Sequence, residues 1–183
     1  MEAAKIWAVA IAIVIAYGVA HDLVTTRVSL EYFTIAKDNA FDSQSPTLLA
    51  LAWGVGATWY IGVFFGGLIA FAARFGSRPK LVVQDLIRPA GLLMLAVATG
   101  ALLAGIAGYT LVRSGTVTLG GHIANEIPAS DHARFYAVVL AHWADYIIGF
   151  IGATLLACWT WLKRANASAQ PVDTGTLELR KAS

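Results

Sequence analysis

The sequence has little cysteine and little charge. One residue of 183 is cysteine, Cys158, so a disulfide framework and a zinc finger are both excluded. Charged residues make up 13% of the chain, whereas an ordinary soluble domain carries about 25%. The net charge of +2 is small and the basic residues are dispersed, which argues against a nucleic-acid partner. The shortage of charge favours a chain that lies in an apolar solvent.

Motifs that mark soluble enzymes are missing as well. The sequence contains no GxSxG, Walker loop, HExxH or dinucleotide fingerprint, and its glycines are scattered through apolar segments. No serine predicted to lie near the polar residues has a histidine close to it in sequence, so nucleophilic catalysis by serine is not expected.

Hydrophobic residues make up 58% of the chain and gather in four long stretches. About 20 apolar residues are needed to cross roughly 30 Å of hydrocarbon. The stretches therefore predict an all-α integral membrane protein, an antiparallel bundle of four transmembrane helices. A cleaved signal peptide is the rival interpretation of the first stretch, and we disfavour it because the segment before it is barely basic. The predicted spans are about 5–26, 46–74, 89–113 and 133–162.

Shorter segments connect and follow the spans. An N-cap at Ser45 followed by Pro46 predicts the start of the second span. Glycines in the second and third spans predict close helix packing. The other segments are an external segment over 27–45, an amphipathic segment at the inner surface over 80–88, an external loop over 114–132 and a disordered cytoplasmic tail over 165–183.

The basic residues predict the orientation of the spans. Lysine and arginine collect on the cytoplasmic side of a membrane protein. The two loops that are predicted to be external carry as many acidic residues as basic ones, or more. Both termini are therefore predicted to be cytoplasmic. The basic residues that mark this side are Arg74, Arg78, Lys80 and Arg88 after the second span, and Lys163 and Arg164 after the fourth.

Ionisable residues interrupt the first and fourth spans. We counted at the helical rise of 1.5 Å per residue from the lysine at the inner end of each span. His21 and Asp22 are then roughly 24 to 26 Å above the inner face, and Asp145 and His142 roughly 27 to 32 Å. If the first helix continues, Arg27 reaches roughly 33 Å. The first and fourth spans are thus predicted to bring these five residues to one layer in the outer half of the membrane.

Three interpretations of this polar layer stay open. In the first, His21, Asp22, His142 and Asp145 ligate a transition-metal ion (Zn, Fe, Mn or Cu) that activates water or oxygen. Haem is not expected, because the chain has four histidines and no attachment motif. In the second, Asp22 or Asp145 pairs with Arg27 in a structural ion-pair network. In the third, the layer handles protons or substrate without a metal.

The stretch HDLVTTRVSLEYFT at 21–34, followed by SPTLL at 45–49 and GSRPK at 76–80, resembles a family of uncharacterised bacterial four-span membrane proteins. The family carries a motif of the type HDxVTxRVxxEYFT, and the resemblance covers residues 15 to 162. It implies the fold, a bacterial origin and an inner-membrane location, but no activity. The positions that match the motif include the residues of the polar layer in the first span, together with Glu31 and Tyr32.

Two classes of function are expected. A metal-dependent membrane hydrolase or oxidase would use Glu31 as a general acid or base, with Arg27 as a second catalytic residue, on a lipid or a small periplasmic molecule. A non-catalytic accessory or structural subunit would pack against other membrane subunits or a second copy of itself, in contact with the lipid bilayer. A small transporter ranks last, because four spans need oligomerisation to enclose a path.

Overall fold

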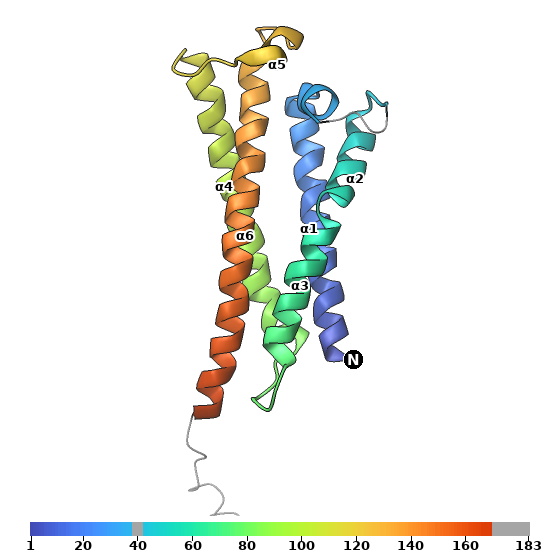
Figure 1. The fold of residues 1–183 in the computed structure, drawn as a ribbon, viewed down its shortest axis with the longest axis vertical. Helices are drawn as coiled ribbons and strands as arrows, with labels where there is room; N and C mark the ends of the chain where they lie inside the picture. Colours follow the sequence, from blue (N-terminus) through green and yellow to red (C-terminus); the bar gives the residue numbers. More distant parts are fainter. Residues whose placement is uncertain (38–41, 170–183) are drawn as a thin grey trace, which may run out of the picture.

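The structure is a computed structural model that describes residues 1–37 and 42–169. Over these residues the chain is helical and contains no strand, which confirms the all-helical prediction (Figure 1). The helices are α1 (Glu2–Val28), the π-helical turn η1 (Tyr32–Ala36), α2 (Pro46–Gly56), α3 (Trp59–Arg74), α4 (Val83–Arg113), α5 (Gly121–Glu126) and α6 (His132–Ala169).

Four helical stretches are long and apolar enough to cross a membrane. Large apolar side chains cover their outward faces; Phe64, Leu102 and Leu103 are all more than 60% exposed. Apolar exposure that extends over whole helices is unusual on a monomeric soluble protein. The stretches are Glu2–Val28, Pro46–Arg74, Val83–Arg113 and His132–Ser168.

The second stretch is divided in two, which the sequence analysis did not predict. α2 ends at Gly56 and α3 begins at Trp59, with a turn between them. The Thr58 hydroxyl donates a hydrogen bond to the Gly54 carbonyl at this turn. Glycine is a weak helix former, and a threonine hydroxyl that bonds the carbonyl four residues back bends a helix. The break lets α2 and α3 follow α1 in two directions.

Two predictions about the ends of helices are wrong. Residues 80–88 do not form a separate surface helix: α4 begins at Val83, where the Asp85 carboxylate accepts from the Val82 backbone at 2.9 Å, and it continues through Pro89. A proline inside a helix removes one backbone hydrogen bond, yet α4 contains Pro89 in its second turn and continues to Arg113. α6 reaches Ala169, so residues 165–169 are helical rather than disordered. The remainder of the predicted tail, 170–183, lies outside the described residues.

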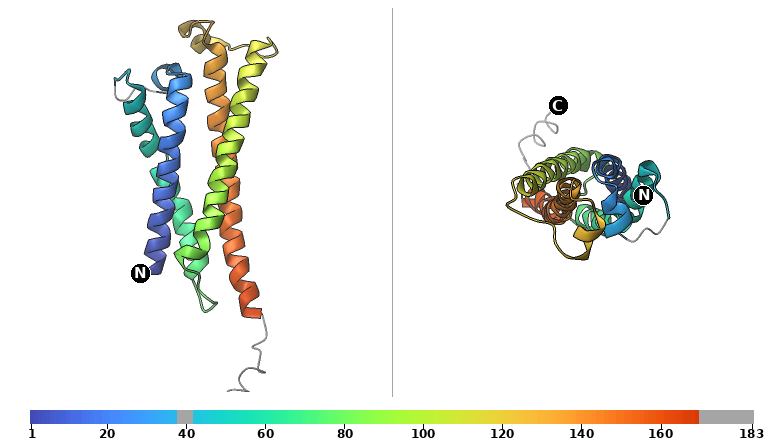
Figure 2. Two further views of the ribbon diagram at one scale, coloured as in Figure 1. Left: turned by 180° about the vertical axis from the view of Figure 1, so that it is seen from behind. Right: turned by 90° about the horizontal axis from the view of Figure 1, so that it is seen from above.

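The helices form two groups, α4 with α6 and α1 with α2 and α3, which Figure 2 shows from two further sides. Glycines allow close contact within each group. A Cβ added at Gly62 would lie 2.9 Å from the Ile11 Cα, and one at Gly108 would lie 2.9 Å from the Tyr136 carbonyl oxygen. The predicted close packing at these glycines is confirmed. The groups meet chiefly through α3 against α6 and α1 against α4.

Arg164 ties α6 to the loop that follows α3. Its side chain is fully buried, and it donates to the carbonyls of Pro79 at 2.7 Å, Ala72 at 2.6 Å, Phe75 at 2.8 Å and Arg78 at 3.1 Å. A guanidinium group can satisfy several acceptors in a fixed geometry. From its sequence context Arg164 is expected only to mark the orientation of the fourth span, whereas in the structure its buried side chain holds α6 to this loop.

Candidate metal centre

Helices α1 and α6 carry the polar residues. The position of α1 is set where it crosses α2, at two glycines, Gly18 and Gly54. At this crossing a Cβ added at Gly18 would lie 2.7 Å from the Gly54 carbonyl oxygen, and one at Gly54 would lie 2.6 Å from the Val19 Cα. The backbones of α1 and α2 therefore touch directly. His21 and Asp22 follow within about one helical turn of this contact. The crossing thus holds the α1 half of the site.

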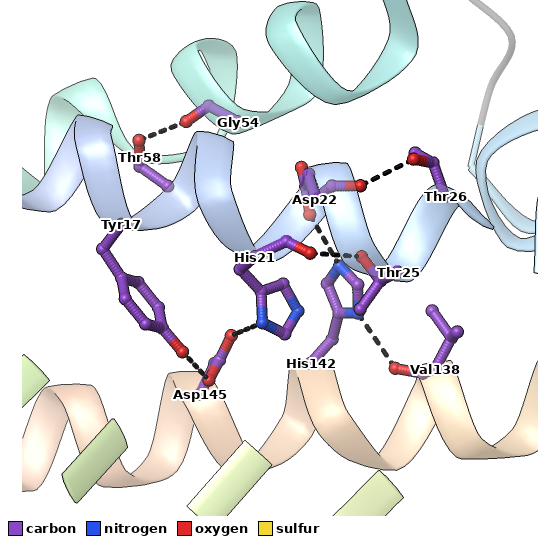
Figure 3. A network of polar contacts seen from close by, with 10 residues as sticks. All are labelled: Tyr17, His21, Asp22, Thr25, Thr26, Gly54, Thr58, Val138, His142 and Asp145. Carbon is purple, nitrogen blue, oxygen red and sulfur yellow. Dashed lines mark hydrogen bonds and ion pairs between the residues drawn. The ribbon is translucent and has the colours of Figure 1, made fainter. Parts of the chain in front are cut away.

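His21 is held by a carboxylate on α6. Its Nδ1 lies 3.0 Å from one oxygen of Asp145, and the other oxygen of Asp145 accepts from the Tyr17 hydroxyl at 2.7 Å (Figure 3). Nδ1 is therefore the nitrogen that donates to the carboxylate, and if the ring carries only this proton, Nε2 holds a lone pair. The Nε2 atom is buried and has no hydrogen-bond partner among the described residues. In a neutral ring a lone pair without a partner is left facing the interior.

His142 has the same arrangement with different partners. Its Nδ1 lies 2.9 Å from the Val138 carbonyl oxygen, which can only accept, so Nδ1 carries the proton. Nε2 lies 3.3 Å from Oδ1 of Asp22, so a protonated ring would form an ion pair with this carboxylate, whereas a neutral ring would turn a lone pair toward it. Two electron-rich atoms at this distance repel each other unless a cation or a second proton lies between them.

Three ligand atoms converge between α1 and α6. His21, Asp22 and His142 each offer one, and these atoms lie within 4.8 Å of one another. The two imidazole rings meet edge to face with centroids 4.7 Å apart. Ligands of a tetrahedral zinc ion are about 3.4 Å apart, so the side chains would close by about an ångström or more around an ion. Two histidines and one carboxylate would leave a coordination position open for water or substrate.

The structure places the other predicted residues as follows. Asp145 lies with the ligand group, but its two oxygens contact His21 and Tyr17; a carboxylate in this position orients a histidine that binds a metal through its other nitrogen. Arg27 donates to the Leu23 carbonyl and to Thr47, and Glu31 accepts from Ser29. No ion pair in the described chain joins Arg27 to a carboxylate. The predicted pairing of Arg27 with an aspartate is therefore not formed.

The segment that follows α1 packs against the site on the side of the α1 C-terminus. The ring of Tyr32 lies 4.5 Å from that of His142, and Phe33, which is fully buried, lies 5.7 Å from it. The Lys37 ammonium lies 4.8 Å from the ring centroids of both Phe33 and Trp53. Burial lowers the pKa of Lys37, and the negative charge of Asp22 opposes part of this shift. Lys37 thus adds a positive group beside the ligands.

Two cavities meet at this layer. The first, of about 290 Å³, lies between α1, α3, α4 and α6 and has His21, Asp22, Lys37, His142 and Asp145 among its lining. The second, of about 590 Å³, lies between α1 and the α4 and α6 pair, and it shares Tyr17 and His21 with the first. The layer therefore has space on both sides.

Sequence reasoning missed two residues of the site. Tyr17 precedes His21 by four residues and so lies on the same face of α1, a spacing that could have identified it. Lys37 gave no such signal, because its position depends on the π-helical turn before it.

No family model, curated protein or solved structure matches the chain. The resemblance to a four-span bacterial family stays a prediction.

Proposed function

We propose that the chain is an integral membrane protein of the bacterial inner membrane that binds one transition-metal ion and acts as a membrane metalloenzyme. Its four long apolar helices would form an antiparallel transmembrane bundle. Both termini would be cytoplasmic, because the segment from the end of α3 to the start of α4 and the end of α6 carry six of the 13 basic residues, against four in the two loops at the other end. The ion would lie between α1 and α6, nearer the outer face.

One observation carries the metal proposal. The Nε2 atoms of His21 and His142 are both buried and lack hydrogen-bond partners in the described chain, while both Nδ1 atoms have one. A histidine that binds a metal through one nitrogen almost always donates from the other to a carboxylate or a carbonyl. Asp145 and Val138 supply one of each. The arrangement supports metal ligation by His21, His142 and Asp22.

The donor set limits the ion and its chemistry. Two imidazoles and one carboxylate suit Zn, Fe, Mn or Cu, and a metal held this way can lower the pKa of a bound water or bind oxygen. The 4.7 Å between the ring centroids leaves no room for a porphyrin between the two imidazoles, so haem is not proposed. In this proposal Asp145 holds His21, Tyr17 holds Asp145, and Tyr32 and Phe33 limit the access of water.

The test is metal content. Protein purified in detergent without a metal-binding tag should carry about one transition-metal ion per chain, measured by inductively coupled plasma mass spectrometry. His142→Ala and Asp22→Ala should each remove nearly all of it. His122→Ala is the matched control, because His122 is exposed and lies in α5, outside the site. Equal metal content in all four proteins would refute the site.

A second candidate has its own support. With an added proton on each histidine in place of the metal, His142 and Asp22 at 3.3 Å, and His21 and Asp145 at 3.0 Å, would form two ion pairs. The layer would then be structural or would handle protons, and the chain would be a non-catalytic subunit of a membrane complex. Folded wild-type protein without metal, purified together with other membrane chains, would favour this candidate.

A further inference from the structure

We infer that the metal centre acts on an amphiphile that has a small anionic head and one unbranched apolar chain. The inference rests on the proposed function and names its substrate class. The head would lie among the ligand residues and Lys37, and the chain would occupy the apolar part of the first cavity. The shape, the charge and the lateral access of the site each support it.

The first cavity is polar at one end only. Its polar groups are those of the ligand residues, Lys37 and Asp145, together with the hydroxyls of Tyr17, Thr58 and Tyr146. Apolar side chains of four helices line the rest, including Ile13, Ile61, Phe65, Met94, Val97 and Ala153. Along α6 the part of the lining from Asp145 to Leu156 spans 11 residue steps. At 1.5 Å per residue this is about 16 Å, the length of an extended alkyl chain of about a dozen carbons. A fully polar substrate would leave this space unfilled.

The charges at the polar end favour an anion once an ion is bound. A divalent metal, Asp22, Asp145 and protonated Lys37 add to about +1, with both histidines neutral as metal ligands. A head with one negative charge would bring the layer to neutrality. Lys37 lines the cavity directly, so its ammonium can reach such a head. The shared chemistry is an anionic oxygen head, either a carboxylate or a phosphate.

The second cavity gives such a molecule a lateral route. It borders Tyr17 and His21, and its rim carries exposed apolar side chains: Val24 at 63%, Leu102 at 64% and Ile106 at 53%. Surface of this kind faces lipid in a membrane. An amphiphile can therefore approach His21 from within the apolar layer, without first leaving for water.

Gly149 allows a direct test of the chain-binding part. It lies on α6 in the lining of the first cavity, and a Cβ added there would meet no atom within 4 Å. Gly149→Leu should fill the cavity without moving the backbone. Gly91→Leu is the matched control, because Gly91 is a helical glycine with the same open surroundings but lies outside this lining. Ala153→Leu is a second cavity-filling variant in case Gly149→Leu folds poorly.

The experiment measures melting temperature in a detergent with a rigid sterol tail, which does not mimic an alkyl chain. The probes are dodecanoate and dodecyl phosphate, with butanoate and butyl phosphate as short controls. A saturating long-chain probe should raise the melting temperature of wild type and Gly91→Leu by about 5 °C. It should leave Gly149→Leu unchanged, and Lys37→Gln should need about tenfold more probe. Whichever of dodecanoate and dodecyl phosphate gives the larger shift in melting temperature identifies the head group as a carboxylate or a phosphate.

Metal content is measured in every sample, so the two proposals fail separately. Metal-loaded wild type without a shift, or a Gly149→Leu or Ala153→Leu variant that responds like wild type, overturns the amphiphile inference and leaves the metal centre standing. A shift that Gly149→Leu abolishes in protein without metal refutes the metalloenzyme and supports amphiphile binding in the cavity. Equal shifts with short and long probes would also overturn the inference.

Discussion

Replacing Asp145 by asparagine separates a metal ligand from a residue that positions one. In wild type the two carboxylate oxygens of Asp145 accept from His21 at 3.0 Å and from Tyr17 at 2.7 Å. Asparagine has the same shape, but it has one accepting oxygen and turns an NH₂ group toward a donor. His21 would then lose its orientation, its tautomer and the negative charge that makes Nε2 more basic, while all three ligand atoms would remain.

The expected magnitude follows from this arrangement. Loss of the group that accepts a hydrogen bond from a metal-bound histidine typically lowers metal affinity by about 10- to 100-fold, or about 1.4–2.7 kcal/mol. Tyr17→Phe removes one hydrogen bond to the carboxylate and leaves His21 paired, so its loss should be smaller, about two- to tenfold. His21→Ala removes a ligand and should abolish binding at micromolar metal.

The assay is competition between the protein and a chelator of known affinity, with each variant in the same detergent. The expected order of affinity is wild type, Tyr17→Phe, Asp145→Asn and then His21→Ala. If Asp145→Asn bound metal as poorly as His21→Ala, Asp145 would be a ligand itself. If Asp145→Asn bound like wild type, the proposed role of the carboxylate would be wrong.

Three further predictions concern stability. Arg164→Ala should lower the free energy of unfolding by about 3 kcal/mol or more, because four carbonyls, one of them buried, lose a charged donor. Lys163→Ala, at the exposed neighbour, should change it by less than about 0.5 kcal/mol in denaturant titrations. Gly54→Ala should lower the free energy of unfolding by about 1–3 kcal/mol in thermal unfolding, since its Cβ would lie 2.6 Å from the backbone of α1. Gly56→Ala, whose Cβ would meet no atom within 4 Å, should leave stability unchanged; an equal loss of stability in both variants would contradict the close crossing of α1 and α2. Burial lowers the pKa of Lys37 below 10.5, so the unfolded chain binds that proton more tightly than the folded chain. The free energy of unfolding should therefore rise with pH up to about 10.5, and a rise of the same size in Lys37→Gln would show that Lys37 is not its source.

The common level of His21, Asp22, His142 and Asp145 along their two helices could be predicted from the sequence. The rise of a helix is constant, so counting from the inner lysines placed His21 and Asp22 at the level of His142 and Asp145, and the structure brings all four together. The same count placed Arg27 in the layer. Its side chain does not contact the aspartates there, because it donates to Thr47 instead. Height along a helix does not give rotation about it.

Rotation depends on packing, which a single sequence does not encode visibly. The pairing of His21 with Asp145, rather than with Asp22, depends on how the glycine crossing turns α1 toward α6. The break in the second stretch and the inward position of Lys37 likewise depend on tertiary contacts. Four apolar stretches, by contrast, were visible in composition alone, because length and hydropathy are local properties.

The buried guanidinium of Arg164 near the C-terminal end of α6 also limits how the length of this chain can vary. Arg164 and His142 are 22 residues apart on one continuous helix, which is about six turns and places them within about 40° of the same face. One residue inserted or deleted between them would turn His142 by about 100° while Arg164 stayed bound to its carbonyls. We therefore expect insertions to be tolerated in the 114–120 loop and rejected between 143 and 163.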